Sequence, residues 1–456
     1  MNNRIHFHKK TVSFQHALLL LLSLWLILTG NAQNPLIRTQ FTADPSARVF
    51  GNRVYIFPSH DILATEGKGR KGWFCMEDYH VYSSENLTEW TDHGMIITQN
   101  NVPWVRPDSY SMWAPDCIER NGKYYFYFPS APADTLAYGK GFTIGVAVAD
   151  KPEGPYTAEI TPINGVRGID PNVFIDKDGQ AYLYWSAGNI YGARLKENMK
   201  ELDSEVKILG DLPNKGLKEG PFLFEREGVY YLTYPHVANK TEQLEYAMAD
   251  SPLGPFKVTG VIMDESPTGC WTNHQSIIQF NNQWYLFYHH NDYSPSFDKA
   301  RSIRADSLFF NEDKTIRKVI PTLRGIGITK ATEKIQLDRY SAISPQGTAI
   351  EYLDTNNRFA GWKTVLSNPG AWIQYNSVEF KNNKTATLHM NGEENGFIEI
   401  RTGKPDGPLI AKMLVVKGSS MNTINAALRK RISGQHNLFV VSKCNKPVYI
   451  DWLSFQ

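Results

Sequence analysis

The sequence predicts an all-β protein, a five-bladed β-propeller followed by a β-sandwich of the jelly-roll type. One strand-rich pattern recurs five times within roughly the first three hundred residues, and helical periodicity is nearly absent. Near Lys330 the repeat stops, and short alternating strands of a different kind follow. A chain of 456 residues is too long for one average domain and suits two. We therefore expect a signal peptide at 1–32, a propeller at 33–330 and a sandwich at 331–456.

Each copy of the repeat starts with a polar group in a tight segment and continues, about ten residues later, into an aromatic-rich alternating strand. The five copies read ADPSARVFGNRVYIFPS (from Ala43), APDCIERNGKYYFYFPS (from Ala114), IDPNVFIDKDGQAYLYWS (from Ile169), KEGPFLFEREGVYYLTY (from Lys218) and NHQSIIQFNNQWYLFYHH (from Asn273). Each copy holds a hairpin signal between two strand-like runs, at Gly51-Asn52, Asn121-Gly122, Asp178-Gly179, Glu227-Gly228 and Asn281-Asn282. The copies start roughly fifty to seventy residues apart, which suits one four-stranded blade with its loops. A series of β-sandwiches is the alternative, since hairpins alone do not distinguish the two folds.

The propeller has a consequence for chemistry, because the innermost strand of every blade lines the central axis. Five polar side chains stand at about the same phase of their repeats: Asp44, Asp116, Asp170, Glu219 and His274. We expect them to converge at one mouth of the central channel. Residues that are far apart in the chain then form one site.

Three of these carboxylic acids fit the hydrolysis of a glycosidic bond. That reaction needs one protonated carboxyl group to donate to the leaving oxygen and one ionised carboxylate to activate water or attack the sugar. A third carboxylate nearby can raise the pKa of the acid and orient it. Asp44, Asp170 and Glu219 supply that set. Each alone could be a turn residue, because Asp before Pro starts turns, but three at equivalent positions favour a site. Asp116 follows its Pro instead of preceding it, and we interpret it as structural.

Five motifs carry a family resemblance: A-D-P-S at Ala43–Ser46, W-A-P-D at Trp113–Asp116, I-D-P-N at Ile169–Asn172, E-G-P-F at Glu219–Phe222 and N-H-Q-S at Asn273–Ser276. In their order and spacing, residues 34–330 resemble glycoside hydrolase family 43, the five-bladed propeller enzymes of clan F. The resemblance implies that Asp44 is the general base that activates water, Glu219 the general acid and Asp170 the residue that tunes and orients that acid. It also implies inversion by single displacement, with base and acid roughly 6.5–9.5 Å apart to admit the water.

The same resemblance suggests further site residues. His274 matches an axial histidine that faces a calcium ion or a water cluster, directly or through water. A hydrogen-bonded core histidine is the alternative, since calcium prefers oxygen ligands. Arg301 matches a position near the base of the site that could hold a sugar hydroxyl or carboxylate, and a surface arginine is the alternative. Trp113 and Trp73 are candidate stacking walls, although Trp113 is equally a core residue. The resemblance implies no required cofactor and leaves open a structural calcium ion on the propeller axis.

The expected activity is release of a terminal sugar from plant-type polysaccharide or oligosaccharide. The resemblance favours α-L-arabinofuranose or β-D-xylose, and includes galactofuranose and galactose. Related five-bladed fructan hydrolases are an alternative, but their acid sits in an E-C-P context, whereas Glu219 precedes Gly-Pro. A non-catalytic glycan-binding propeller is the alternative from another class. We would expect it to lack one of the three carboxylates.

The segment 331–456 resembles carbohydrate-binding module family 6. Four stretches carry this resemblance: AWIQYNSVEF, GFIEIRTGKPDGPLIAKMLV, GQHNLFVVSK and VYIDWLSFQ. The loop after Gly418 reads SSMNTIN where sugar-binding members usually place a Trp, and Gln336 stands where a calcium-ligating Glu is common. A packing domain that buttresses the propeller is therefore the alternative. Three residues remain as candidates for glycan contacts: Tyr352, Trp362 and Asn445.

The N-terminus has the pattern of a secretory signal peptide. Arg4, Lys9 and Lys10 precede an apolar run, Ala17–Leu28, and small residues lead to a cleavage position after Ala32. The run is too short for a comfortable membrane span, and no lipoprotein cysteine follows it. These features predict a periplasmic or secreted protein.

Charge and cysteine content exclude several classes. A formal net charge of +2 leaves no basic footprint for nucleic acid. The four cysteines are widely scattered and contain no C-x-x-C pair, which argues against a zinc site. An exported protein can form disulfides, and the sequence leaves open whether these cysteines pair or stay as buried thiols.

Overall fold

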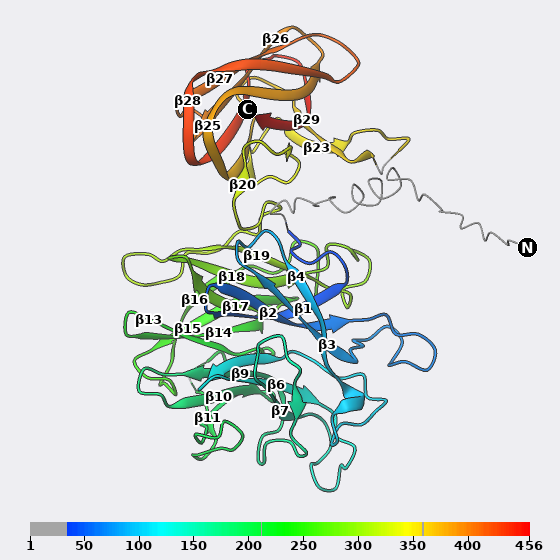
Figure 1. The fold of residues 1–456 in the computed structure, drawn as a ribbon, viewed down its shortest axis with the longest axis vertical. Coiled ribbons are helices and arrows are strands. Elements are labelled where there is room, and N and C mark those ends of the chain that lie inside the picture. Colours follow the sequence, from blue (N-terminus) through cyan, green and yellow to red (C-terminus); the bar gives the residue numbers. More distant parts are fainter. Residues whose placement is uncertain (1–33, 211, 358–359) are drawn as a thin grey trace, which may run out of the picture. The chain divides into compact units, whose positions relative to one another are not determined.

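The protein is described by a computed structural model, in which residues 34–210, 212–357 and 360–456 are described. The predicted signal peptide, 1–32, lies outside the described residues. Five small antiparallel sheets follow one another along the chain, and one large sheet follows them (Figure 1). This confirms the predicted all-β fold, a five-bladed propeller and then a sheet-rich domain. Among the described residues, no helix has the length and hydropathy that a transmembrane span requires.

The five sheets of the propeller each contain three or four neighbouring strands. The first contains β1 (Phe41–Phe50), β2 (Arg53–Asp61), β3 (Asp78–Ser84) and β4 (Thr91–Thr98), and the 3-10 helix η2 (Gln99–Asn101) follows. The second contains β5 (Asp116–Arg120), β6 (Lys123–Ser130), β7 (Thr143–Ala149) and β8 (Thr157–Ala158). The third contains β9 (Ile169–Ile175), β10 (Ala181–Ser186), β11 (Ile190–Arg194) and β12 (Lys207–Ile208). The fourth contains β13 (Phe222–Arg226), β14 (Val229–Val237), β15 (Glu242–Ala249) and β16 (Lys257–Met263). The fifth contains β17 (Ser276–Phe280), β18 (Gln283–His290) and β19 (Ser302–Leu308).

The first strands of the five sheets contact one another in a ring. β1 contacts β5, β5 contacts β9, β9 contacts β13, β13 contacts β17, and β17 contacts β1. Because these strands surround the axis, the start of each repeat faces the central channel, as the sequence predicts. The ring is closed by the beginning of the described chain, where the Leu36 N–H donates to the Ile303 carbonyl oxygen in β19 at 2.8 Å.

All five predicted hairpin turns lie between the first two strands of their sheets. Three of these turns contain a residue pair in the left-handed region, Asn121-Gly122 (φ 53° and 73°), Glu227-Gly228 (φ 52° and 81°) and Asn281-Asn282 (φ 50° and 62°). Two-residue hairpins need positive φ values because only these turns match the right-handed twist of the strands. Gly is favoured there because it has no Cβ, and Asn tolerates the same region.

Aromatic side chains fill the space between neighbouring sheets. Between the first and second sheets, the rings of Tyr79 and Phe126 lie 5.0 Å apart in an edge-to-face contact, and Trp104 stacks on Phe128 at 5.7 Å. Gly145 in β7 lies beneath Trp104, and a Cβ added there would lie 2.3 Å from Trp104 Cζ2. This position therefore has no room for any side chain. Much of the aromatic content of the chain serves this core.

Asp116 is structural, as predicted from its place after Pro. Its carboxylate forms an ion pair with Arg48 and accepts hydrogen bonds from Ser46 Oγ (2.5 Å), Asn172 Nδ2 (3.1 Å) and the Val173 N–H (2.7 Å). These partners belong to the first and third sheets, and Asp116 itself belongs to the second. Asp116 thus links the inner strands β1, β5 and β9 around the axis.

The C-terminal domain is one sheet that folds around its own core. Its strands are β20 (Thr329–Lys330), β21 (Ile335–Gln336), β22 (Ala342–Ile343), β23 (Thr348–Tyr352), β24 (Trp362–Leu366), β25 (Trp372–Gly392), β26 (Gly396–Thr402), β27 (Leu409–Val415), β28 (Asn422–Ser442) and β29 (Val448–Phe455). The main path runs β23-β24-β29-β25-β28-β26-β27. The long strands β25 and β28 pair antiparallel over most of their length, with register shifts at bulges. Bulges bend a strand, which lets one pair of strands contribute to both layers of a sandwich.

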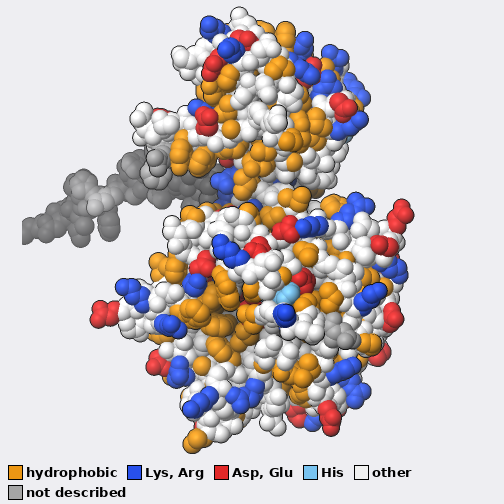
Figure 2. All heavy atoms as spheres, turned by 180° about the vertical axis from the view of Figure 1, so that it is seen from behind, with side chains coloured by type: hydrophobic (Ala, Val, Ile, Leu, Met, Phe, Trp, Pro, Cys, Tyr) orange, Lys and Arg blue, Asp and Glu red, His pale blue; other side chains and the backbone are white. Residues whose placement is uncertain are grey.

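The structure shows the state of the cysteines and the distribution of charged side chains on the propeller. All four cysteines, Cys75, Cys117, Cys270 and Cys444, are buried free thiols. On the propeller face drawn in Figure 2, Lys and Arg side chains alternate with Asp and Glu instead of gathering in one stripe.

Candidate active site

A small pocket opens where the inner strands begin. Its volume is about 170 Å³, and it is lined by Asp44, Trp73, Phe74, Met76, Trp113, Ala114, Ile169, Asp170, Glu219, Trp271, Thr272, Asn273, His274 and Arg301. All seven side chains singled out in the sequence as catalytic or substrate-binding belong to this lining. The structure thus brings these seven side chains together around one pocket, whereas Asp116, which shares the repeat phase, does not line it.

Asp44 lies in β1 with its backbone in the left-handed region (φ 47°). One oxygen, Oδ2, accepts a hydrogen bond from Ser59 Oγ at 2.6 Å, and Oδ1 accepts one from Arg301 Nη1 at 2.8 Å. Burial raises the pKa of Asp44, but Arg301, the two neighbouring histidines His289 and His274 and the Ser59 hydrogen bond together outweigh it and lower the pKa to about 2. Asp44 is therefore an ionised carboxylate at neutral pH.

Arg301 is held by two carboxylates. Its Nε and Nη2 atoms donate to the two oxygens of Asp61 at 2.9 Å each, while Nη1 faces Asp44. The side chain is only 3% exposed, so the alternative of a surface arginine is wrong. Asp61 is fully buried beside it. This fork of two parallel bonds fixes the guanidinium, and the guanidinium in turn fixes the orientation of Asp44.

Asp170 lies in β9 with the same left-handed backbone (φ 57°). Its Oδ2 atom accepts a hydrogen bond from the Gly220 N–H at 3.0 Å, one residue after Glu219. Burial raises the pKa of Asp170 to about 7, with a further contribution from the Glu219 charge. Asp170 therefore contacts the loop that carries Glu219. The Asp170 carboxyl group itself gains or loses a proton near neutral pH.

Glu219 precedes β13 and has a second carboxyl group against it, that of Glu242. Burial raises the pKa of Glu219, and the Asp44 charge adds to this effect. Glu242, the first residue of β15, is fully buried, and its Oε2 atom accepts the Asn273 N–H at 2.6 Å. Burial raises the pKa of Glu242 well above its ordinary value, and the nearby Glu219 charge adds to this effect. Glu242 therefore holds a proton more tightly than an exposed glutamate does.

Two histidines lie beside Asp44. His289 is fully buried, accepts the Asp44 N–H at Nδ1 (3.1 Å) and has Nε2 3.1 Å from the Thr272 carbonyl oxygen. Burial lowers the pKa of His289 to about 3, so the ring is neutral. His274 lies half-buried with Nδ1 3.8 Å from Asp44 Oδ1. Both rings lie nearest the Oδ1 atom of Asp44, whereas Ser59 binds Oδ2.

The surroundings of His274 bear on the predicted calcium ion. Calcium takes six to eight oxygen ligands. Within the described residues, the group of three metal-type side chains that lie close enough to share an ion does not include His274. Calcium binding at His274, directly or through water, stays a prediction, and no step below depends on a metal.

Aromatic rings form the walls of the pocket. Trp73 is 40% exposed and Trp271 is 36% exposed, so both present ring surface to a ligand. Trp113 is half-buried and packs against Phe142 at 4.5 Å and Phe74 at 5.8 Å. The Trp113 ring thus belongs to both the core and the pocket.

Sequence reasoning missed several residues that contact this site, namely Asp61, Glu242, Trp271 and His289. Asp61 is the last residue of β2 and lies outside the five motifs, and Trp271 lies two residues before the N-H-Q-S motif. Glu242 and His289 carry no local signal, because each lies in an ordinary strand of its sheet. Only the packing of neighbouring strands places them beside the acids.

Comparison with known proteins agrees with both parts of the chain. Residues 32–316 match the family model for glycosyl hydrolases family 43, and residues 342–456 match that for carbohydrate binding module (family 6). Xylosidase/arabinosidase 43A of Humicola insolens is 34% identical over 331 residues, covering 62% of this chain and 98% of that protein.

Solved structures of similar proteins share the fold. A β-xylosidase/α-arabinofuranosidase from a compost microbial metagenome, in complex with xylotriose, is 34% identical with a TM-score of 0.57, covering 64% of this chain and 98% of that one. An arabinoxylan arabinofuranohydrolase from Bacillus subtilis, in complex with cellotetraose, is 25% identical with a TM-score of 0.55. That likeness covers 94% of this chain and 98% of the other.

Proposed function

This chain belongs to glycosyl hydrolase family 43 and is a glycoside hydrolase, and from this premise we propose that it releases terminal α-L-arabinofuranose or β-D-xylose from xylan-type chains. The names of its relatives, xylosidase/arabinosidase and arabinoxylan arabinofuranohydrolase, support these two sugars. The pocket of about 170 Å³ is smaller than the roughly 300–1,000 Å³ typical of drug-sized ligands. This size supports an exo-acting site for one sugar ring.

The mechanism is supported by one observation: two carboxyl groups in one pocket have pKa values shifted in opposite directions. Asp44 has a pKa of about 2, whereas the pKa of Glu219 is raised. Hydrolysis requires this opposition, since one group must be ionised while the other holds a proton. Asp44 is the general base and Glu219 the general acid.

The reaction is a single displacement. Asp44 removes a proton from water as the water oxygen bonds to the anomeric carbon, and Glu219 donates its proton to the departing glycosidic oxygen. The low pKa of Asp44 means that proton transfer comes late, after the forming carbon–oxygen bond has acidified the water. Arg301 keeps Asp44 ionised and oriented, and because Arg301 also lines the pocket, its contact with a sugar hydroxyl or carboxylate stays a prediction. The product has inverted configuration, and base and acid should lie roughly 6.5–9.5 Å apart.

Asp170 and Glu242 both affect the acid. Asp170 holds the backbone beside Glu219 through the Gly220 N–H, and its negative charge opposes ionisation of Glu219. Glu242 lies beside the same side chain and lowers the pKa of Glu219, while burial raises its own pKa well above the ordinary value. Trp73, Trp113 and His274 would contact the sugar ring, the tryptophans through its apolar faces.

The activity test is hydrolysis of nitrophenyl arabinofuranoside, xyloside and galactofuranoside, together with arabinan, xylan and arabinogalactan. Inactivity on every one of these would contradict the proposal and favour a glycan-binding propeller. Glu219→Gln should remove acid assistance, so substrates with a good leaving group should lose less rate than those with a poor one. An equal loss for all leaving groups would assign Glu219 a different role.

We also propose that the protein is exported and that its C-terminal domain contacts glycan. The signal-peptide pattern in 1–32 supports export to the periplasm or the medium. In the sandwich, Tyr352 and Trp362 stack at 4.2 Å on neighbouring strands, and Trp362 is 38% exposed. Such a platform suits the apolar face of a sugar. Amino-terminal sequencing of the exported protein, expected to begin at Gln33, tests the first proposal, and co-sedimentation of Trp362→Ala with insoluble xylan tests the second.

A further inference from the structure

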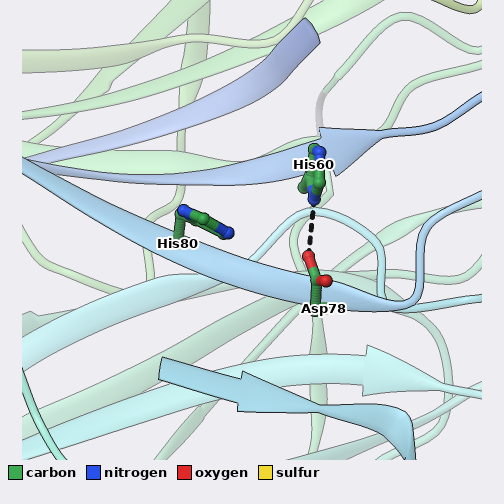
Figure 3. A group of neighbouring side chains, drawn as sticks. All are labelled: His60, Asp78 and His80. Carbon is green, nitrogen blue, oxygen red and sulfur yellow. Dashed lines mark hydrogen bonds and ion pairs between the residues drawn. The ribbon is translucent and has the colours of Figure 1, made fainter. Parts of the chain in front are cut away.

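A second cluster of metal-type side chains lies on the first sheet, outside the pocket. His60 in β2 and Asp78 and His80 in β3 each offer a ligand atom, and these atoms all lie within 4.8 Å of one another (Figure 3). The His60 Nδ1 and Asp78 Oδ1 atoms are 2.6 Å apart, and the two imidazole rings lie 5.4 Å apart. The three side chains are 15–19% exposed, so an ion from solution can reach them.

The backbone presents these residues on one surface. Asp78 and His80 are two positions apart in β3, so they point to the same face of the sheet. Strands β2 and β3 are antiparallel, and Ile56 pairs with Tyr82. Continuing this register along both strands places His60 opposite Asp78. The sheet, and not a loop, therefore sets the spacing of the three ligand atoms.

His80 is also oriented as a metal ligand usually is. Its Nδ1 atom lies 3.1 Å from Asp92 Oδ1 and 3.3 Å from Asp92 Oδ2, which leaves the other ring nitrogen for an ion. Histidines that bind metals commonly donate their second N–H to a carboxylate, which fixes the ring and raises its basicity. Asp92 would supply that outer carboxylate from the neighbouring strand, β4.

We propose that His60, Asp78 and His80 bind one zinc ion, with water in the fourth position. Two imidazoles and one carboxylate suit zinc, whereas calcium and magnesium prefer all-oxygen sets. Zinc lies about 2.0–2.2 Å from such ligand atoms, so the ligand atoms of a tetrahedral site are roughly 3.4 Å apart. Small side-chain adjustments from the present spacing reach this geometry, with the ion replacing the proton between His60 and Asp78.

The site would join strands at the edge of the active site. His60 directly precedes Asp61, the carboxylate that holds Arg301. Zinc would thus tie β2 to β3 beside the support of the catalytic base and stabilise the folded propeller by binding it in preference to the unfolded chain. The scattered cysteines argued against zinc, but this site uses none of them.

The test is zinc titration of the tagless full-length mature protein after treatment with a chelator, followed by calorimetry and thermal unfolding. Wild type should bind one zinc ion with micromolar or tighter affinity and unfold at a higher temperature when zinc is present. His80→Ala and Asp78→Asn should each weaken binding at least about tenfold, and Asp92→Asn about 10–100-fold. His436→Ala, which removes a histidine of the sandwich, is the matched control and should bind zinc like wild type.

Cobalt(II) substitution gives a second readout, because its visible spectrum reports a tetrahedral site with nitrogen and oxygen ligands. Circular dichroism without metal shows whether each variant is folded, so lost binding is not confused with lost structure. Absence of stoichiometric zinc binding by the wild type would overturn the proposal. Equal zinc affinity in wild type, His80→Ala and Asp78→Asn would overturn it as well.

Discussion

Replacing Asp170 with asparagine should make the protein more stable while removing its activity. The folded environment raises the pKa of Asp170 from 3.8 to about 7, mainly through burial. At about 1.36 kcal/mol per pH unit, this difference corresponds to about 4 kcal/mol of destabilisation when the group is ionised. Asparagine keeps the size of the side chain, tolerates the left-handed backbone at φ 57° and can still accept the Gly220 N–H. Only the buried charge is lost.

The pH dependence gives the sharpest form of this prediction. A raised pKa means that the folded protein binds the proton more tightly than the unfolded chain, so wild-type stability falls as pH rises from about 4 to about 7. The stability gained through Asp170→Asn should therefore be about 3 kcal/mol larger at pH 8 than at pH 5. Urea unfolding at the two pH values, followed by circular dichroism, measures it.

Asp116→Asn is the matched control, because Asp116 starts β5 as Asp170 lies in β9. Its carboxylate is paired with Arg48, and breaking a buried ion pair costs about 3–5 kcal/mol. This variant should be destabilised at both pH values. If Asp170→Asn behaves like Asp116→Asn, or gains equally at pH 5 and pH 8, the reasoning about a buried, strained charge in the site is refuted.

Three further predictions concern the base, the acid and the core. Arg301→Met should raise the pKa of Asp44, so the acidic limb of the kcat/KM profile should move up by at least about one pH unit, and an unmoved limb would contradict the role of the arginine. Glu242→Leu should remove the side-chain interaction that lowers the pKa of Glu219, so the alkaline limb should shift to higher pH; an unchanged alkaline limb would make Glu242 merely structural. Gly145→Ala should lower the free energy of unfolding by about 1–3 kcal/mol, because its Cβ would lie 2.3 Å from Trp104, and wild-type stability in urea would show that the ring can move away.

The architecture was predictable because a propeller repeats one local pattern. Alternating aromatic strands, turn residues such as Asn121-Gly122 and the spacing of the copies are all properties of short segments. Once the blades are recognised, symmetry alone places the start of each repeat at the axis. Asp44, Asp170 and Glu219 could therefore be brought together without knowledge of any contact.

Contacts between sheets were not predictable in this way. Arg301 could have been a surface residue by its local sequence, and it is buried because Asp61 and Asp44 flank it from β2 and β1. Glu242 lies in an unremarkable strand, and only the packing of the fourth sheet against the channel sets it against Glu219. Partners of this kind depend on side chains from several strands, which no short segment encodes.

The two Asp-Pro pairs show which properties the sequence determined and which ones the tertiary structure decided. Asp44 and Asp170 share the dipeptide, the repeat phase and a left-handed backbone, with φ values of 47° and 57°. The sequence by itself determined that much, because turn chemistry and strand periodicity act over a few residues. The pKa values of about 2 and about 7 were decided by the tertiary structure alone. A charge responds to whatever lies within a few ångströms, and the fold places Arg301 beside one carboxylate and Glu219 beside the other.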